Sequence, residues 1–155
     1  RDLGDEPSIY DGPQYLSDDI WCRNQYNELT NATYQNPIND GINPTYVYVR
    51  VRNREKYVSQ GTADLKLYWS KAATNLTWPQ HRDGSITMPL PNGTGSASLG
   101  DIISTLTIPP IEPMSQTIMQ FTWMPPNPSD YDSFNSQKTH FCLLARIDAP
   151  TVDPM

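Results

Sequence analysis

The stretch from Thr45 to Asn53 reads Thr-Tyr-Val-Tyr-Val-Arg-Val-Arg-Asn, and its strict alternation constrains the fold more than any other part of the chain. In an extended strand, Val47, Val49 and Val51 share one face, whereas the tyrosines and arginines share the other. A helix, with about 3.6 residues per turn, would spread these valines round its surface. The stretch is therefore predicted to be a β-strand whose valine face is covered by a second layer.

Other segments of the chain repeat this pattern, and breakers rich in proline, glycine and asparagine separate them. The 15 Pro and 8 Gly supply turns, and residues that favour helices are sparse. We therefore predict an all-β, immunoglobulin-like antiparallel β-sandwich of about seven strands with long loops. The expected strands are 19–23, 45–54, 62–70, 85–88, 101–108, 116–124 and 140–147, and the long loops are 24–44 and 71–100.

The same alternation predicts which side chains cover the valine face. The expected cover consists of Leu65, Leu67, Trp69, Met119, Phe121, Trp123, Phe141, Leu143 and Ile147. The opposite face of the strand 45–54 carries an outward row of Tyr46, Tyr48, Arg50 and Arg52. This row is either ordinary strand surface or a contact face. Cys142 and Leu144 occupy the second face of the last strand, which we also expect to be covered.

Three segments are expected along the chain. Residues 1–18 form an irregular acidic lead-in, residues 19–148 the sandwich, and residues 149–155 a Pro-rich linker. The lead-in carries Ile9, Tyr10, Tyr15 and Leu16, which we expect to lie across the sandwich. Both ends look like cuts in a longer polypeptide, and no apolar run approaches the roughly 18 residues of a membrane span.

The charge of the chain excludes one class of partner. A net charge of −6 and scattered Lys and Arg argue against nucleic-acid binding, which needs clustered basic residues. The expected partners are neighbouring domains, surface proteins or glycans. Cys22 and Cys142 both fall in predicted strands, so a disulfide is geometrically conceivable; we favour two separate buried thiols, because two cysteines define no spacing pattern.

Three segments resemble bacterial CARDB modules, the immunoglobulin-like "cell adhesion related domain found in bacteria": Asn43–Arg54, Ala63–Trp69 and His140–Ile147. Val49-Arg50-Val51-Arg52-Asn53-Arg54 follows the family's Val-x-Val-x-Asn pattern, and Asp148 matches its end. Position 55 is Glu where the family has Gly, so the following turn is expected to be remodelled and longer. The resemblance covers about residues 43–148 and implies an accessory role in a secreted or cell-surface protein.

No catalytic constellation is evident. His81 and His140 lack a nucleophile at a diagnostic spacing, and no hydrolase, metalloprotease or phosphate-loop motif occurs, so the chain is not expected to be an enzyme. No cofactor is expected, although calcium is an alternative, because Asp18, Asp19 and Asp40, with Asn39 and Asn43, supply loop oxygens. Such residues are more often turn formers, and their spacing fits no EF-hand.

Glycan binding is the sharpest ligand hypothesis, because sugars stack on exposed aromatic rings. Tyr46, Tyr48 and Tyr68 are expected to point outward from strands, and Trp78, Tyr131 and Phe134 to lie on loops; ordinary strand surface is the favoured alternative. Sequons for N-glycosylation occur at Asn31, Asn75 and Asn92, and we expect them to be accidental in a bacterial protein. We therefore expect a non-catalytic spacer or adhesion module, with a carbohydrate-binding module and a subunit assembling through edge strands as alternatives.

Overall fold

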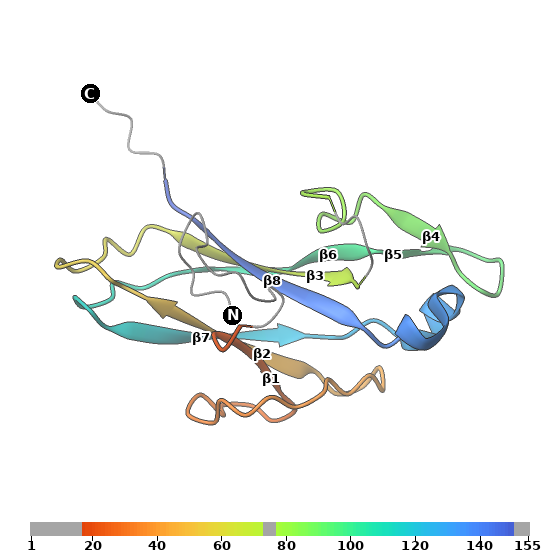
Figure 1. The fold of residues 1–155 in the computed structure, drawn as a ribbon, viewed down its shortest axis with the longest axis horizontal. Coiled ribbons are helices and arrows are strands. Elements are labelled where there is room, and N and C mark those ends of the chain that lie inside the picture. The colour runs from red at the N-terminus through yellow and green to blue at the C-terminus, as the bar shows by residue number, and fades with distance from the viewer. Residues whose placement is uncertain (1–16, 73–76, 151–155) are drawn as a thin grey trace.

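The structure, a computed structural model, describes residues 17–72 and 77–150 as an all-β chain with antiparallel sheets, which confirms the all-β part of the predicted fold class (Figure 1). One 3₁₀ helix interrupts the strands of these described residues. The elements in chain order are β1 (Ile20–Arg23), β2 (Thr45–Arg52), β3 (Asp64–Lys71), β4 (Thr87–Pro89), β5 (Ser96–Ser98), β6 (Gly100–Thr107), β7 (Gln116–Trp123), η1 (Pro128–Gln137) and β8 (Phe141–Asp148).

The first sheet, sheet A, has the order β1-β2-β7. The predicted central strand β2 pairs with β7 from Thr45 opposite Trp123 to Arg52 opposite Gln116. On its other side β1 pairs in a register that places Cys22 opposite Val47. The valines of β2, the large apolar residues of β7 and Cys22 therefore share one face of the sheet, as the alternation predicts.

The second sheet, sheet B, has the order β6-β3-β8. Strand β8 pairs with β3 over the whole of its length, with Leu65 opposite Ile147 and Trp69 opposite Leu143. The pairing of β3 with β6 shifts register between Leu67 and Tyr68. Sheet B is therefore antiparallel throughout, and the leucines of β3 face the same way as Leu143.

Both sheets contribute to one hydrophobic core, which contains the predicted valines and most of their predicted cover. Ile147 is the exception, because its side chain faces inward but is 54% exposed. Tyr131 and Ile111, which the sequence pattern does not place in the core, join it from irregular segments. The buried core members are Cys22, Val47, Val49, Val51, Leu65, Leu67, Trp69, Ile108, Ile111, Phe121, Trp123 and Tyr131.

The connections differ from the prediction at two places. The expected loop 71–100 contains the hairpin β4–β5, and the expected loop before β8 contains η1. Figure 1 shows both at the same end of the molecule, and the Tyr131 hydroxyl of η1 donates to the Ser98 carbonyl of β5 over 2.6 Å. The predicted strand 85–88 overlaps β4, whereas β5 and η1 have no apolar alternation that would reveal them.

The predicted lead-in and linker lie almost wholly outside the described residues, which include only 17–18 of the first and 149–150 of the second. Within the described part, no helix is long and apolar enough to span a membrane.

Candidate recognition surface

The outer face of sheet A was predicted to expose Tyr48, and this prediction is wrong. Tyr48 is 0% exposed, because its ring stacks on Trp21 at 5.7 Å between centroids and residues of the 24–44 loop cover it. Its hydroxyl accepts a hydrogen bond from the Glu28 backbone N–H at 2.9 Å and donates to the Gln25 carbonyl at 3.3 Å. A ring held in this way cannot offer a stacking surface to a sugar.

The rest of this face is also occupied by internal contacts. Arg50 and Arg52 both bind the carboxylate of Asp19, and the Arg50 guanidinium lies 5.3 Å from the centre of the Trp21 ring. Tyr46 is half-buried and meets Tyr26 edge-on at 5.5 Å. The outward row of β2 is thus part of the frame of the molecule and not a free contact face.

The outer face of sheet B is different, because it carries a strip of apolar and aromatic side chains that reaches solvent. Tyr68 of β3 lies opposite Ile102 of β6 on one side and opposite Leu144 of β8 on the other, so the three form a row across the sheet. Trp78 stands edge-on against Tyr68 at 5.1 Å, and the Arg146 guanidinium lies 4.5 Å from the centre of the Trp78 ring. These five residues are the outer strip.

Exposure within the outer strip is concentrated at its rim. Trp78 is 45% exposed and Ile102 is 42% exposed, whereas Tyr68 is only 8% exposed beneath the indole. Next to the strip, Lys66 forms an ion pair with Asp148 at 2.6 Å. The strip offers an exposed ring and a guanidinium, and the ion pair beside it adds an ammonium and a carboxylate; such groups can contact the faces and hydroxyls of sugars.

The segment 77–86 holds Trp78 in place. The Gly84 backbone N–H donates to the Gly100 carbonyl at 3.0 Å, and the His81 ring nitrogen Nδ1 accepts from the Thr77 backbone N–H at 3.0 Å. A Cβ on Gly100 would lie 1.8 Å from the His81 carbonyl oxygen, so the segment can approach the sheet only because residue 100 is glycine. The segment therefore packs closely against the outer face of sheet B, with Trp78 on its solvent-exposed side.

The predicted loop aromatics Tyr131 and Phe134 pack inside the molecule, and for Tyr131 the expected exposure is wrong. Tyr131 is buried, and desolvation raises its pKa to about 12. Both rings lie near the ammonium of Lys71, whose Nζ donates to the carbonyls of Gln137 and His140. Burial lowers the pKa of Lys71. This lysine, which the sequence pattern leaves in a loop, fastens η1 to the end of β3.

The structure does not bring the calcium candidates Asp18, Asp19 and Asp40 together as one ligand set. Asp19 is engaged by the two arginines, and Asp40 accepts hydrogen bonds from the backbone N–H groups of Ile42 at 2.9 Å and Asn43 at 2.8 Å. These hydrogen bonds lower the pKa of Asp40 to about 2, and the bond from the Asn43 backbone N–H has the largest effect. In residues 17–72 and 77–150 no group of three or more His, Cys, Asp or Glu could hold a metal, and calcium binding stays a prediction.

The two cysteines are free thiols and belong to different environments. Cys22 lies in the core, where burial raises its pKa to about 12. Cys142 is half-buried on the outer face of β8. Of the sequons, Asn31 and Asn92 are exposed, and Asn75 lies outside the described residues.

Sequence reasoning found Tyr68 and Trp78 but not the residues that complete the outer strip. The sequence places Ile102 and Arg146 on predicted strands. It does not show which residues of neighbouring strands their outward side chains contact, because the order of strands in a sheet cannot be read from a single sequence. The only available signal was the double-faced character of the last strand, where Leu144 needs a cover. Comparison with family models, curated proteins and solved structures finds no match to the chain.

Proposed function

We propose that the chain is a non-catalytic, immunoglobulin-like β-sandwich of the CARDB type that acts as an accessory module, a spacer or adhesion domain, in a larger secreted or cell-surface bacterial protein. The observation that supports this most is the extent to which ionisable and aromatic residues hold the frame together. The Asp19–arginine cluster, the Tyr48 hydrogen bonds and the Lys71 contacts all join one segment of the fold to another. Such a unit is stiff and leaves recognition to a limited surface.

The immunoglobulin-like topology is tested by an experimentally determined structure or by long-range backbone contacts in NMR spectra. The expected contacts join β2 to β7 and β3 to β8, with the sheets packed face to face. Contacts between β2 and β3 as direct hydrogen-bonded neighbours would contradict the topology. The accessory role is tested by stretching the chain between inert handles, where a stiff module unfolds in one cooperative step.

A second function, carbohydrate binding, is favoured by the outer strip. An indole with 45% exposure, a stacked guanidinium and an adjacent ion pair form a small platform of the kind that sugars use. In this proposal Trp78 supplies the stacking face and Arg146 donates hydrogen bonds to sugar hydroxyls. Tyr68 does not touch the ligand but supports the indole from below.

A glycan array with the wild-type chain and two variants tests this second function. Trp78→Ala and Arg146→Ala should each abolish binding, whereas Tyr57→Ala, which removes a 79% exposed ring outside the outer strip, should leave it unchanged. Equal loss in the Tyr57 variant would assign the signal to nonspecific stacking. Absence of binding by the wild-type chain would leave the accessory role and remove the carbohydrate proposal.

A further inference from the structure

Cys142 is a half-buried free thiol near the start of β8, on the outer face of sheet B. Ser70 of β3 lies directly opposite it, and Gly100 of β6 lies directly opposite Ser70 on the other side. Directly opposite residues of antiparallel strands place their side chains on the same face, with Cβ atoms about 4.5–5.5 Å apart. The Ser70 hydroxyl is therefore directed to the same part of the outer face as the Cys142 sulfur.

The segment 77–86 brings a guanidinium to this part of the face. Its His81 carbonyl lies against Gly100, and its Gly84 backbone N–H donates to the Gly100 carbonyl at 3.0 Å. Arg82 stands between these two anchors with its side chain half-buried. Burial lowers the pKa of Arg82, and the charge that the Cys142 thiol can carry acts in the opposite direction. The guanidinium and the sulfur are thus electrostatic neighbours.

Ser70 and Arg82 both hold buried donors that lack an acceptor. Ser70 is 0% exposed, and neither its Oγ nor the Arg82 Nη1 has a hydrogen-bond partner in the described part of the chain. The neighbouring Asp83 carboxylate is engaged elsewhere, because it accepts from the Ser85 backbone N–H at 2.9 Å. Leaving a buried donor unpaired is unfavourable, most of all when the donor is charged. An acceptor atom carried by the Cys142 sulfur would satisfy both donors.

A second cation acts on the same thiol. Lys71 follows Ser70 in β3, and its Nζ is held by the carbonyls of Gln137 and His140. Burial lowers the pKa of Lys71, and the charge of the Cys142 thiol again acts in the opposite direction. Reactive cysteines lie in electropositive, partly exposed surroundings, because positive charge favours the thiolate. Cys142 has such surroundings.

Cys22 has the opposite surroundings. It is 0% exposed in the hydrophobic core, and burial raises its pKa to about 12. A buried thiol in apolar surroundings is inert, because the reactive form is the thiolate. The chain therefore contains its own control for the reactivity of Cys142.

We propose that Cys142 is a site of oxidation by small peroxides, and that Ser70 and Arg82 bind the oxygen atom that the reaction adds to the sulfur. The Cys142 thiolate attacks one oxygen of hydrogen peroxide, so that an S–O bond forms while the O–O bond breaks. The departing hydroxide takes up the proton that the thiol released and becomes water. The sulfur is oxidised by two electrons to a sulfenic acid, and the peroxide is reduced by two. In its anionic form the sulfenate oxygen accepts from the Ser70 hydroxyl and from the Arg82 guanidinium.

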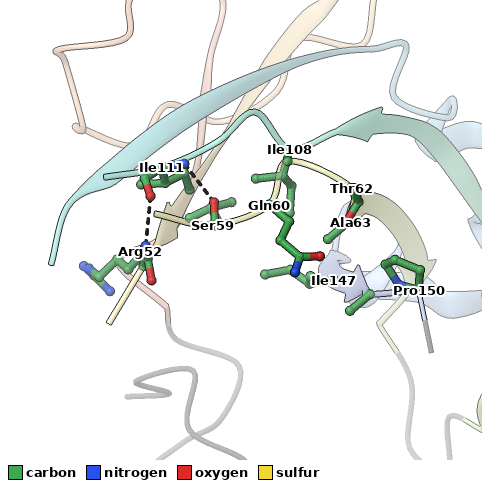
Figure 2. Close-up of a pocket in the computed structure, with 13 residues that line it drawn as sticks. Arg52, Ser59, Gln60, Thr62, Ala63, Ile108, Ile111, Ile147 and Pro150 are labelled. Atoms are coloured by element: carbon green, nitrogen blue, oxygen red, sulfur yellow. Dashed lines mark hydrogen bonds between the residues drawn. The ribbon is translucent and has the colours of Figure 1, made fainter. Parts of the chain in front are cut away.

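This site is separate from the apolar pocket of about 340 Å³ that Figure 2 shows. The lining of the pocket includes Ile147, near the far end of β8 and about 17 Å along the strand from Cys142. Peroxide therefore reaches the sulfur from the outer face of sheet B, and the reaction does not depend on the pocket.

Trapping with dimedone, which reacts with sulfenic acids and not with thiols, tests the proposal in the full chain. The folded chain is treated with hydrogen peroxide and dimedone, and peptide mass spectrometry measures the label and any higher oxide at each cysteine. Oxidation of Cys142 should exceed that of Cys22 by about tenfold or more. Equal oxidation of the two cysteines, or neither label nor higher oxide at Cys142, would overturn the proposal.

Two variants separate the donors from the thiol itself. Arg82→Gln and Ser70→Ala should each slow the oxidation of Cys142 about fivefold to tenfold, because the developing sulfenate loses one donor. The control Lys56→Gln removes an exposed positive charge from the connection between β2 and β3 and should leave the rate unchanged.

Cys22 reports folding in every variant, because it becomes reactive only when the core opens. Ser70→Ala removes a hydroxyl without a partner, so this variant should stay folded and can decide the question alone if Arg82→Gln opens the core. A folded Ser70→Ala variant that oxidises at the wild-type rate would contradict the proposed role of the hydroxyl.

Discussion

The outer faces of the two sheets have the same alternation of aromatic and charged residues in the sequence, but they differ in how far their aromatic rings are exposed to solvent. On sheet A, Tyr48 is closed in by the residues that follow β1, and the arginines beside it share one carboxylate. On sheet B, Tyr68 is covered by the indole of Trp78, which itself remains 45% exposed. The first face is sealed by hydrogen bonds, whereas the second is covered by a ring that still meets solvent.

The difference shows that an outward aromatic residue on a strand is only a candidate for recognition. What decides its role is the loop that crosses it. The loop over sheet A satisfies the Tyr48 hydroxyl and buries the ring, so this residue contributes to stability. The segment 77–86 over sheet B places the Trp78 ring at the surface. Trp78 and Arg146, and not the covered Tyr68, are therefore the residues that could contact a ligand.

The largest expected effect separates the two faces by stability. Tyr48→Ala should lower the free energy of unfolding by about 4 kcal/mol, because it empties a fully buried aromatic site. Trp78→Ala should cost only about 1 kcal/mol, since half of the indole is already in solvent. Urea unfolding of both variants measures the difference. Equal losses would show that Trp78 is as structural as Tyr48, which would contradict the comparison.

The cover over sheet B should depend on one glycine. Gly100→Ala should lower the free energy of unfolding by about 3 kcal/mol, because the new methyl group would meet the His81 and Trp69 carbonyl oxygens. It should also raise the exposure of the Trp78 ring, which fluorescence quenching measures. Gly93→Ala, at a φ of +75° with nothing within 4 Å, is the control and should cost about 1 kcal/mol through backbone strain alone.

The hydroxyl groups provide a finer comparison. Tyr48→Phe should lower the free energy of unfolding by about 1.5 kcal/mol, because the Glu28 N–H and the Gln25 carbonyl lose their partner under a buried ring. Tyr68→Phe should change it by less than about 0.5 kcal/mol, because the described residues offer that hydroxyl no hydrogen bond. Thermal unfolding of the two variants side by side measures this. A larger loss of unfolding free energy for Tyr68→Phe than for Tyr48→Phe would contradict the conclusion that the Tyr48 hydroxyl is the one that stabilises the fold.

The smallest effect concerns acid and the loop that covers sheet A. The pKa of Asp40 is held at about 2 in the folded chain, below the value near 3.8 of the free side chain. Its contribution to stability is therefore fully present above about pH 4 and is lost as the pH falls through about 2. An NMR titration of the Asp40 carboxyl should show this midpoint. Asp40→Asn should remove this part of the acid dependence, and a titration near pH 4 would contradict the turn geometry.

Several structural features could be predicted from particular residues. The alternations at Val47, Leu65 and Phe121 placed each strand and its inner face correctly, because one side chain in two must be buried in a covered strand. The same rule failed for Ile147, which faces inward at a corner where no described residue covers it. It also missed η1, whose buried Tyr131 contacts Lys71 from a distant part of the chain and Phe141 at the start of the next strand.

By itself the sequence determined the all-β class, most of the strands and which side of each strand is buried, because these depend on local periodicity and on breakers such as Pro and Gly. Only the tertiary structure decided which outward residues are free. Tyr48 and Trp78 are both aromatic residues that the sequence places outside the core, yet one is sealed and the other exposed. The reason is that burial of an outer face depends on where loops return, and this is set by contacts between residues far apart in the chain.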